Sequence, residues 1–169
     1  MATNQIVRPS RPPYAPDAYE RLLAVASAVL LAMVAAAILR GRADWARVPL
    51  PVWAHLATLA VALSLTPAIL LRPRGDRPHR RLGWLWAACL FATALISFLI
   101  RQANPGHLSL IHLLSAWMLG LVPLIVWSAS THRVALHRRA VRGAVSGALL
   151  IAGFFTFPFD RMLGHWLFG

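Results

Sequence analysis

Histidines recur at matched positions in the two halves of this 169-residue chain. His55 and His112 each open an apolar stretch, and His79 and His137 each follow one and precede two arginines. His79 comes 24 residues after His55, and His137 comes 25 residues after His112. A neutral imidazole nitrogen accepts a proton or binds a metal ion, so this spacing predicts proton handling or metal ligation.

The two histidine pairs belong to a tandem repeat. The apolar stretch of each copy carries one proline, Pro67 or Pro123, within similar local sequence (TPAIL and VPLIV). Parallel repeats of membrane hairpins place equivalent residues at equivalent depths. The repeat therefore predicts one pair of histidines at each of two depths, His55 with His112 and His79 with His137.

Composition indicates a membrane protein. Hydrophobic residues make up 59% of the chain and charged residues only 13%, too few for an ordinary soluble surface. The net charge of +12 comes from arginines at the ends of apolar runs, as the positive-inside rule requires, so nucleic-acid binding is not expected. Cys89 is the only cysteine, which excludes an intrachain disulfide and a cysteine-based metal site.

The predicted fold class is all-α: a polytopic membrane bundle with five transmembrane helices. The expected spans are about 22–39, 50–71, 82–100, 108–127 and 141–159, each near the ~20 residues that cross a bilayer. Spans two–three and four–five form the hairpin repeat. Residues 1–16, rich in proline, are expected to be a disordered cytoplasmic tail, and 17–169 a single membrane domain. Tryptophans near the span ends are expected interface anchors: Trp45, Trp53, Trp84, Trp86 and Trp127.

Arginine asymmetry predicts the orientation. Twelve arginines lie on the side of the amino terminus and five on the opposite side. We therefore expect a bacterial inner-membrane protein with a cytoplasmic amino terminus and a periplasmic carboxyl terminus.

His55 and His112 are the first candidate ligand pair. Their helix faces carry Thr58 and Ser115, which makes these faces small and polar and directs them into the bundle. Two imidazoles facing each other across helices are the axial ligands of a b-type haem, with Thr58 and Ser115 as supporting groups. Structural or proton-handling histidines, or another metal, are the alternatives.

His79 and His137 are the second candidate pair. They adjoin paired arginines at the membrane boundary, where they would hold a haem near the cytoplasmic surface with arginines close to its propionates. The alternative is an interfacial basic cluster on anionic lipid. His107, His132 and His165 are expected to be solvated.

A family resemblance rests on several of these residues: His55 in a helix, the run His79-Arg80-Arg81-Leu82-Gly83-Trp84, Ser97, and His137-Arg138-Arg139. The pattern resembles a bacterial family of four-helix predicted membrane proteins of unknown function, over about residues 50–160, with the first span as an added helix. A looser likeness is to four-helix di-haem membrane cytochromes b, which implies two layers of histidine ligands.

The leading functional prediction is a b-type haem protein that exchanges electrons with a quinol or a partner centre. The alternatives are a non-catalytic accessory subunit or assembly factor of a larger membrane complex, and a small transporter. The lipid bilayer is the expected partner in every case, and a homo-oligomer is compatible with each. Nothing in the sequence resembles a hydrolase, because neither a Ser/His/Asp set in register nor a glycine-rich phosphate loop is present.

Overall fold

The computed structural model describes residues 15–100, 110–158 and 161–169, and within that part every regular element is a helix. His107, Asp160 and nearly all of the predicted tail lie outside the described residues. The elements in chain order are α1 (Ala18–Arg40), a 3₁₀ segment (Gly41–Arg47), α2 (Leu50–Leu71), α3 (Arg77–Ser97), α4 (Leu110–Ser130), α5 (Val134–Gly143), a π-helical segment (Ala144–Ile151), α6 (Ala152–Phe154) and α7 (Met162–Phe168).

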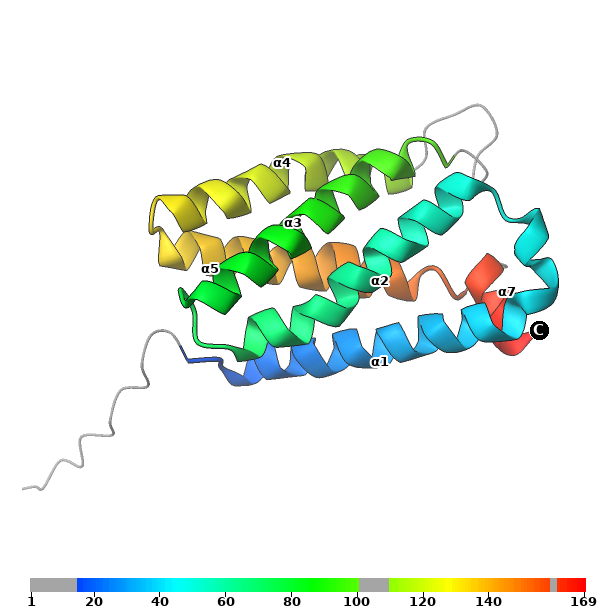
Figure 1. The fold of residues 1–169 in the computed structure, drawn as a ribbon, viewed down its shortest axis with the longest axis horizontal. Coiled ribbons are helices and arrows are strands. Elements are labelled where there is room, and N and C mark those ends of the chain that lie inside the picture. The colour runs from blue at the N-terminus through cyan, green and yellow to red at the C-terminus, as the bar shows by residue number, and fades with distance from the viewer. Residues whose placement is uncertain (1–14, 101–109, 159–160) are drawn as a thin grey trace, which may run out of the picture.

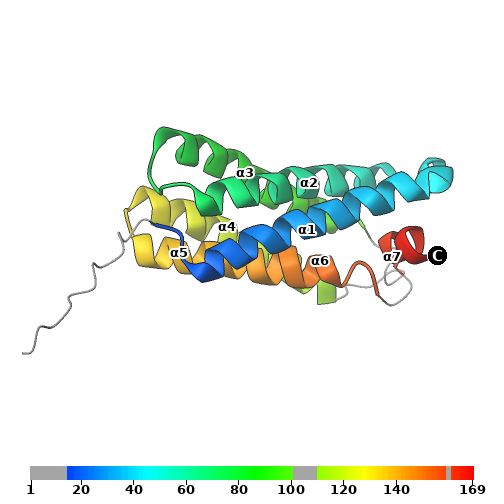
Figure 2. The same ribbon diagram turned by 90° about the horizontal axis from the view of Figure 1, so that it is seen from below.

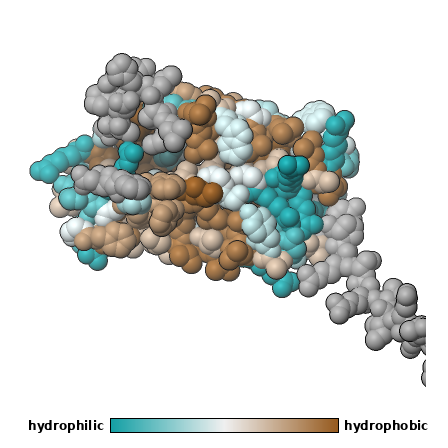
Figure 3. Space-filling view, turned by 180° about the vertical axis from the view of Figure 1, so that it is seen from behind, coloured by the Kyte–Doolittle hydropathy of each residue, from teal (hydrophilic) through white to brown (hydrophobic). Residues whose placement is uncertain are grey.

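The long helices run back and forth along one axis (Figures 1 and 2). The start of α1, the α2–α3 turn and the α4–α5 turn meet at one end, and the 3₁₀ segment and α7 lie at the other. Helix α3 packs against α2 and against α4, while α1 packs against α2, the π-helical segment and α7. On the face seen in Figure 3, apolar residues fill the middle and hydrophilic residues gather toward both ends.

Three helices are long and apolar enough to cross a membrane: Ala18–Arg47, Leu50–Leu71 and His112–Ser130. They correspond to the first, second and fourth predicted spans, which confirms the membrane class. The helix that contains most of the predicted third span, about 82–100, is shifted toward the amino terminus, because α3 begins at Arg77 and ends at Ser97. The first turn of α3 carries charged residues. A hydropathy argument leaves them out of a membrane span, although charged residues form helices readily.

The helical path that contains most of the predicted fifth span also starts and ends earlier than the span. The helical path begins at Val134 and continues through the π-helical segment to Phe154, where 141–159 was expected. Hydropathy located the apolar part correctly, but helix formation does not require apolar residues, and the turn with His137, Arg138 and Arg139 is helical. His137 therefore lies within α5, one turn after its start.

Local sequence explains where the helices start and stop. Asp17 caps α1 in a capping box with Glu20, and Asp76 caps α3 by accepting the His79 backbone N–H at 2.6 Å. Gly75 takes a φ of +88° in the turn before α3, a conformation that side chains disfavour. The chain leaves α2 just before Pro73, which has no N–H with which to continue the helix.

Trp86 ties α2 to α3 in the core. It is only 2% exposed, and its indole N–H donates to the Thr66 hydroxyl at 3.0 Å. The prediction that Trp86 anchors the interface is therefore wrong, whereas Trp84, two residues earlier on the helix, is 65% exposed. A buried indole needs a partner for its N–H, and Thr66 supplies it.

The end of the bundle that holds α7 is closed by Trp45, Trp53 and Trp166, here called the tryptophan end. The rings of Trp45 and Trp53 pack edge-on at 5.5 Å between centroids, and Trp53 stacks on Trp166 at 6.5 Å. The Trp166 indole N–H donates to the Asp44 carboxylate at 3.3 Å. This cluster joins the carboxyl-terminal helix to the end of α1.

Gly41 is required where α7 meets α1. A Cβ at this position would collide with the Trp166 ring, which is rigid and buried. We expect Gly41→Ala to lower the free energy of unfolding by about 1–3 kcal/mol, the range for an overpacked core, and to shift tryptophan emission. Thermal unfolding in detergent measures this. Gly83→Ala is the control, because nothing lies within 4 Å of the added methyl group. Equal effects of the two variants would contradict the tight contact.

Candidate functional site

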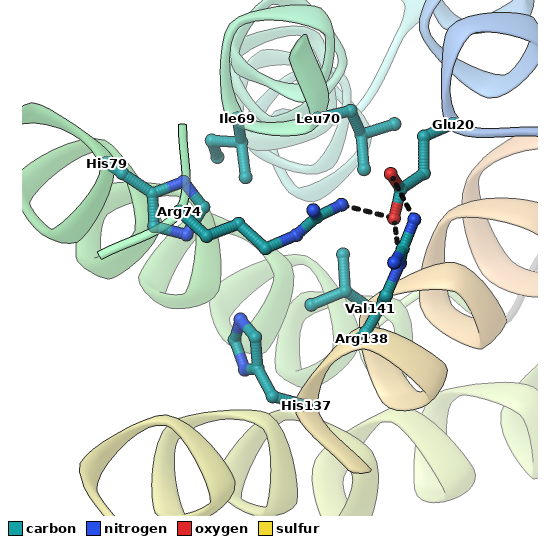
Figure 4. Close-up of a pocket in the computed structure, with 8 residues that line it drawn as sticks. All are labelled: Glu20, Ile69, Leu70, Arg74, His79, His137, Arg138 and Val141. Carbon is teal, nitrogen blue, oxygen red and sulfur yellow. Dashed lines mark hydrogen bonds and ion pairs between the residues drawn. The ribbon is translucent and has the colours of Figure 1, made fainter. Parts of the chain in front are cut away.

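A buried carboxylate organises the end of the bundle opposite the tryptophan end. Glu20, in the first turn of α1, is 1% exposed and forms ion pairs with Arg74, Arg138 and Arg142 (Figure 4 shows the first two). Arg138 binds it through two parallel contacts, Nε to Oε1 at 2.8 Å and Nη2 to Oε2 at 3.0 Å. A buried carboxylate is costly unless it is paired and hydrogen-bonded, and Glu20 is both. We call this end the arginine end.

Asp17 extends the cluster to two carboxylates. It accepts the Glu20 backbone N–H at 3.0 Å, and its carboxylate pairs with Arg142 and with Arg138, the latter at 2.9 Å. Burial alone would raise the pKa of Asp17, but the hydrogen bonds from Glu20 and Arg142 and the charges of both arginines hold the pKa below its ordinary value. The cluster therefore joins α1, the α2–α3 turn and α5 with two negative and three positive groups.

Sequence analysis missed this cluster. The chain has only five acidic residues, and two of them, Asp17 and Glu20, lie within one turn of the first span. That scarcity was the available signal, since an acid beside a long apolar helix usually has a partner. The sequence does not say which of the 17 arginines are the partners.

His79 and His137 line one cavity beside this cluster. The cavity has a volume of about 20 Å³ and is also lined by Glu20, Arg74 and Arg138 (Figure 4). Ile69, Leu70 and Val141 complete its wall. The predicted second pair is therefore a pair in space, recessed behind arginines that turn inward to Glu20.

Backbone carbonyls fix where the protons lie on these two rings. Nδ1 of His137 donates to the Ile125 carbonyl at 3.1 Å, which leaves a lone pair on Nε2. The His79 ring donates to the Ile69 carbonyl. Nδ1 of His79 is buried and has no hydrogen-bond partner among the described residues, so Nε2 is its donor. One ring thus presents Nε2 as a base and the other presents Nδ1.

Burial and neighbouring charges disfavour the protonated form of both rings. Burial is the largest cause of the lowered pKa of His79, and the nearby His137 and Arg74 lower it further, against the opposing charge of Asp76. Burial likewise lowers the pKa of His137, with Arg74 adding to it and the Ile125 hydrogen bond opposing it. Neutral rings with one nitrogen bonded to a carbonyl are poised as proton acceptors or metal ligands.

His55 lies toward the other end of the bundle and is held by α3. Its Nδ1 is 3.2 Å from the Ser97 hydroxyl, which gives its own hydrogen to the Thr93 carbonyl at 2.9 Å. Because a hydroxyl has one hydrogen, Nδ1 of His55 is the donor to Ser97, and Nε2 keeps the lone pair. The polar group that orients His55 is thus Ser97.

Thr58 does not take the place predicted for it beside the His55 ring. Its hydroxyl lies 3.0 Å from two carbonyls of its own helix, those of Ala54 and His55, and 2.7 Å from the Thr93 hydroxyl. Thr58 therefore supports the ring indirectly, through Thr93 on α3.

His112 is 4% exposed, and its ring packs against Phe98 at 5.6 Å between centroids. Phe98 directly follows Ser97, so His55 and His112 contact adjacent residues at the same end of α3. Ser115, one turn along α4 from His112, is also buried. The two histidines thus approach α3 at one level of the bundle.

The histidines expected to be solvated are exposed where the structure describes them. His132 is exposed in the α4–α5 turn at a φ of 56°, and His165 is exposed on α7.

Comparison with known proteins found no matching family model, no matching curated protein and no matching solved structure. Function is therefore inferred from the residues themselves.

Removing the Glu20 charge tests the cluster. Glu20→Gln leaves three inward-turned guanidiniums without their shared partner, so we expect a loss of about 3 kcal/mol in the free energy of unfolding, the lower end for a broken buried pair. Denaturant unfolding in detergent provides the measurement. Arg47→Gln is the control, because the Asp44–Arg47 pair is solvent-exposed and worth little. An unaltered stability in Glu20→Gln would show that the cluster does not hold the bundle together.

Proposed function

We propose that this chain is a small integral protein of a bacterial inner membrane that binds one b-type haem between His55 and His112 and exchanges electrons with a quinol or a partner centre. The observation that carries the proposal is the setting of His55. The Ser97 hydroxyl, which donates to the Thr93 carbonyl, holds the proton of the His55 ring on Nδ1. The basic Nε2 of His55 therefore faces away from Ser97. Iron-ligating histidines characteristically have their other ring nitrogen bonded in this way.

The position of His112 supports the same pair. It is buried, lies on a different helix from His55, and contacts α3 one residue from the position that His55 contacts. A bound haem would supply one-electron chemistry, cycling between ferric and ferrous iron. Ser97 and Thr93 would set the orientation and basicity of the His55 ligand, and the apolar helices around them would exclude water.

The haem is assigned to the His55/His112 pair alone. The cavity between His79 and His137, about 20 Å³, has room for one water molecule. Arg74 and Arg138 beside it are already occupied by Glu20 and so do not extend toward propionates.

Visible spectroscopy tests the proposal. Protein purified from haem-replete cells should show sharp α and β bands on reduction, and His112→Ala should abolish them because it removes one of the two histidines that would hold the haem. His132→Ala is the matched control, since that histidine is exposed. A folded but colourless wild type would overturn the haem assignment and leave the chain as an accessory subunit or assembly factor.

We also propose that the apolar parts of α3 and of the α5–α6 path, beyond the turns that carry His79 and His137, cross the membrane, which makes five crossings with α2–α3 and α4–α5 as a hairpin repeat. Equivalent hydrogen bonds support the repeat. His79 donates to the carbonyl of Ile69, two residues after Pro67, and His137 to that of Ile125, two residues after Pro123.

The positive-inside rule places the arginine end in the cytoplasm and the tryptophan end in the periplasm. Reporter fusions test this orientation. An enzyme that folds only in the cytoplasm should be active after Gly75 or Arg133, which lie at the arginine end, and silent after Arg47 or Gly169. The reverse pattern would invert the orientation, and activity at Gly169 with activity at Gly75 would contradict five crossings.

A further inference from the structure

We propose that the cavity between His79 and His137 holds one water molecule that bridges the two rings, so that the arginine end contains a buried site for a single proton. This site is separate from the haem proposal and does not depend on it. It uses the pair of histidines that the electron-transfer function leaves without a role.

The size and lining of the cavity point to water. About 20 Å³ exceeds the ~10–15 Å³ that one water requires. Nδ1 of His79 is a buried lone pair with no hydrogen-bond partner among the described residues, and a buried polar atom of this kind needs one. Nε2 of His137 is the second lone pair, and Figure 4 shows the His137 ring directed toward Arg74 and His79. A water molecule has two hydrogens, and it donates one to each ring.

The surrounding charges favour a proton over a metal cation. The charged groups that face the rings come from every element around the cavity: Glu20 on α1, Arg74 and Asp76 before α3, and Arg138 on α5, with Arg142 and Asp17 behind Glu20. The two carboxylates at Glu20 and Asp17 are taken up by three arginines, so neither is available as a metal ligand. No group of three or more potential metal ligands occurs within the described part of the chain.

The site takes up one proton because the rings repel a second. Burial holds the pKa of each ring below its ordinary value, and the charge of one histidine lowers the pKa of the other. A proton bound to either ring moves through the water to the other by exchanging hydrogen-bond partners, with no net chemistry. When it is bound, a positive charge lies next to Arg74, whose guanidinium is paired with Glu20.

This arrangement makes the arginine end sensitive to acid. Each ring binds a proton more weakly in the folded protein than in the unfolded chain. The resulting stability is present above the ordinary histidine pKa of ~6.5 and is lost as the pH falls below that value. The stability that Asp17 contributes is lost only below the ordinary pKa range of a carboxyl group. The histidine effect and the Asp17 effect therefore occur in different pH windows.

Nitrogen NMR of ¹⁵N-histidine protein in nanodiscs, recorded on the reduced form, tests the site. At about pH 7.5 we expect His137 protonated on Nδ1 and His79 on Nε2, two opposite tautomers, with His79→Gln and His137→Gln providing the assignment. If a glutamine variant does not fold, the corresponding asparagine variant replaces it. Identical tautomers, or two charged rings at this pH, would overturn the proposal.

Melting temperature supplies an independent readout. The wild type should melt at a lower temperature at about pH 5 than at about pH 7.5, and each glutamine variant should show a smaller difference because it has one ring fewer to charge. His132→Gln should keep the full wild-type difference. An unchanged pH dependence in both His79→Gln and His137→Gln would overturn the proposal.

The haem bands separate this proposal from the function proposed above. A colourless wild type would remove the haem assignment and leave the expected tautomers as they are. Bands that persist in His112→Ala but disappear in His79→Gln would make His79 an iron ligand, and would overturn the water-bridged site.

Discussion

The fold depends on one buried negative charge. Glu20 lies at the start of the first apolar helix, and burying its carboxylate costs several kcal/mol unless positively charged groups are buried beside it. Arg74 from the α2–α3 turn and Arg138 from α5 supply the positive charge. Three segments far apart in sequence are therefore held at one point, which fixes α5 against α1 and brings His137 next to His79.

The backbone around His79 and His137 determines which nitrogen of each ring carries the proton. The Ile69 carbonyl would bond the N–H of residue 73 if α2 continued, but that residue is Pro73, so the carbonyl is left for the His79 ring. In the second copy Ile125 accepts from both His137 and the Ser128 hydroxyl. The tautomer of each ring is thus set by a helix carbonyl, and with it the nitrogen that remains as a base.

The two ends of the bundle provide different environments. Around His55 and His112 the described neighbours are hydroxyl groups and an aromatic ring. Around His79 and His137 the neighbours are fully charged groups and a cavity the size of a water molecule, which suits a group whose charge changes. Matched spacing in the sequence supplies a histidine pair at each level, and the neighbours of the two pairs differ.

The sequence by itself determined the helical class, the second span to the residue, the recurrence of histidine and the gathering of arginine on one side. These follow from local composition, because an apolar run of sufficient length has few alternatives to a membrane helix. Only the tertiary structure decided that Ser97 and not Thr58 orients His55, that Trp86 is core, and that Glu20 selects Arg74, Arg138 and Arg142. Partner choice between residues on different helices depends on how those helices pack, and a periodic pattern within one helix does not encode it.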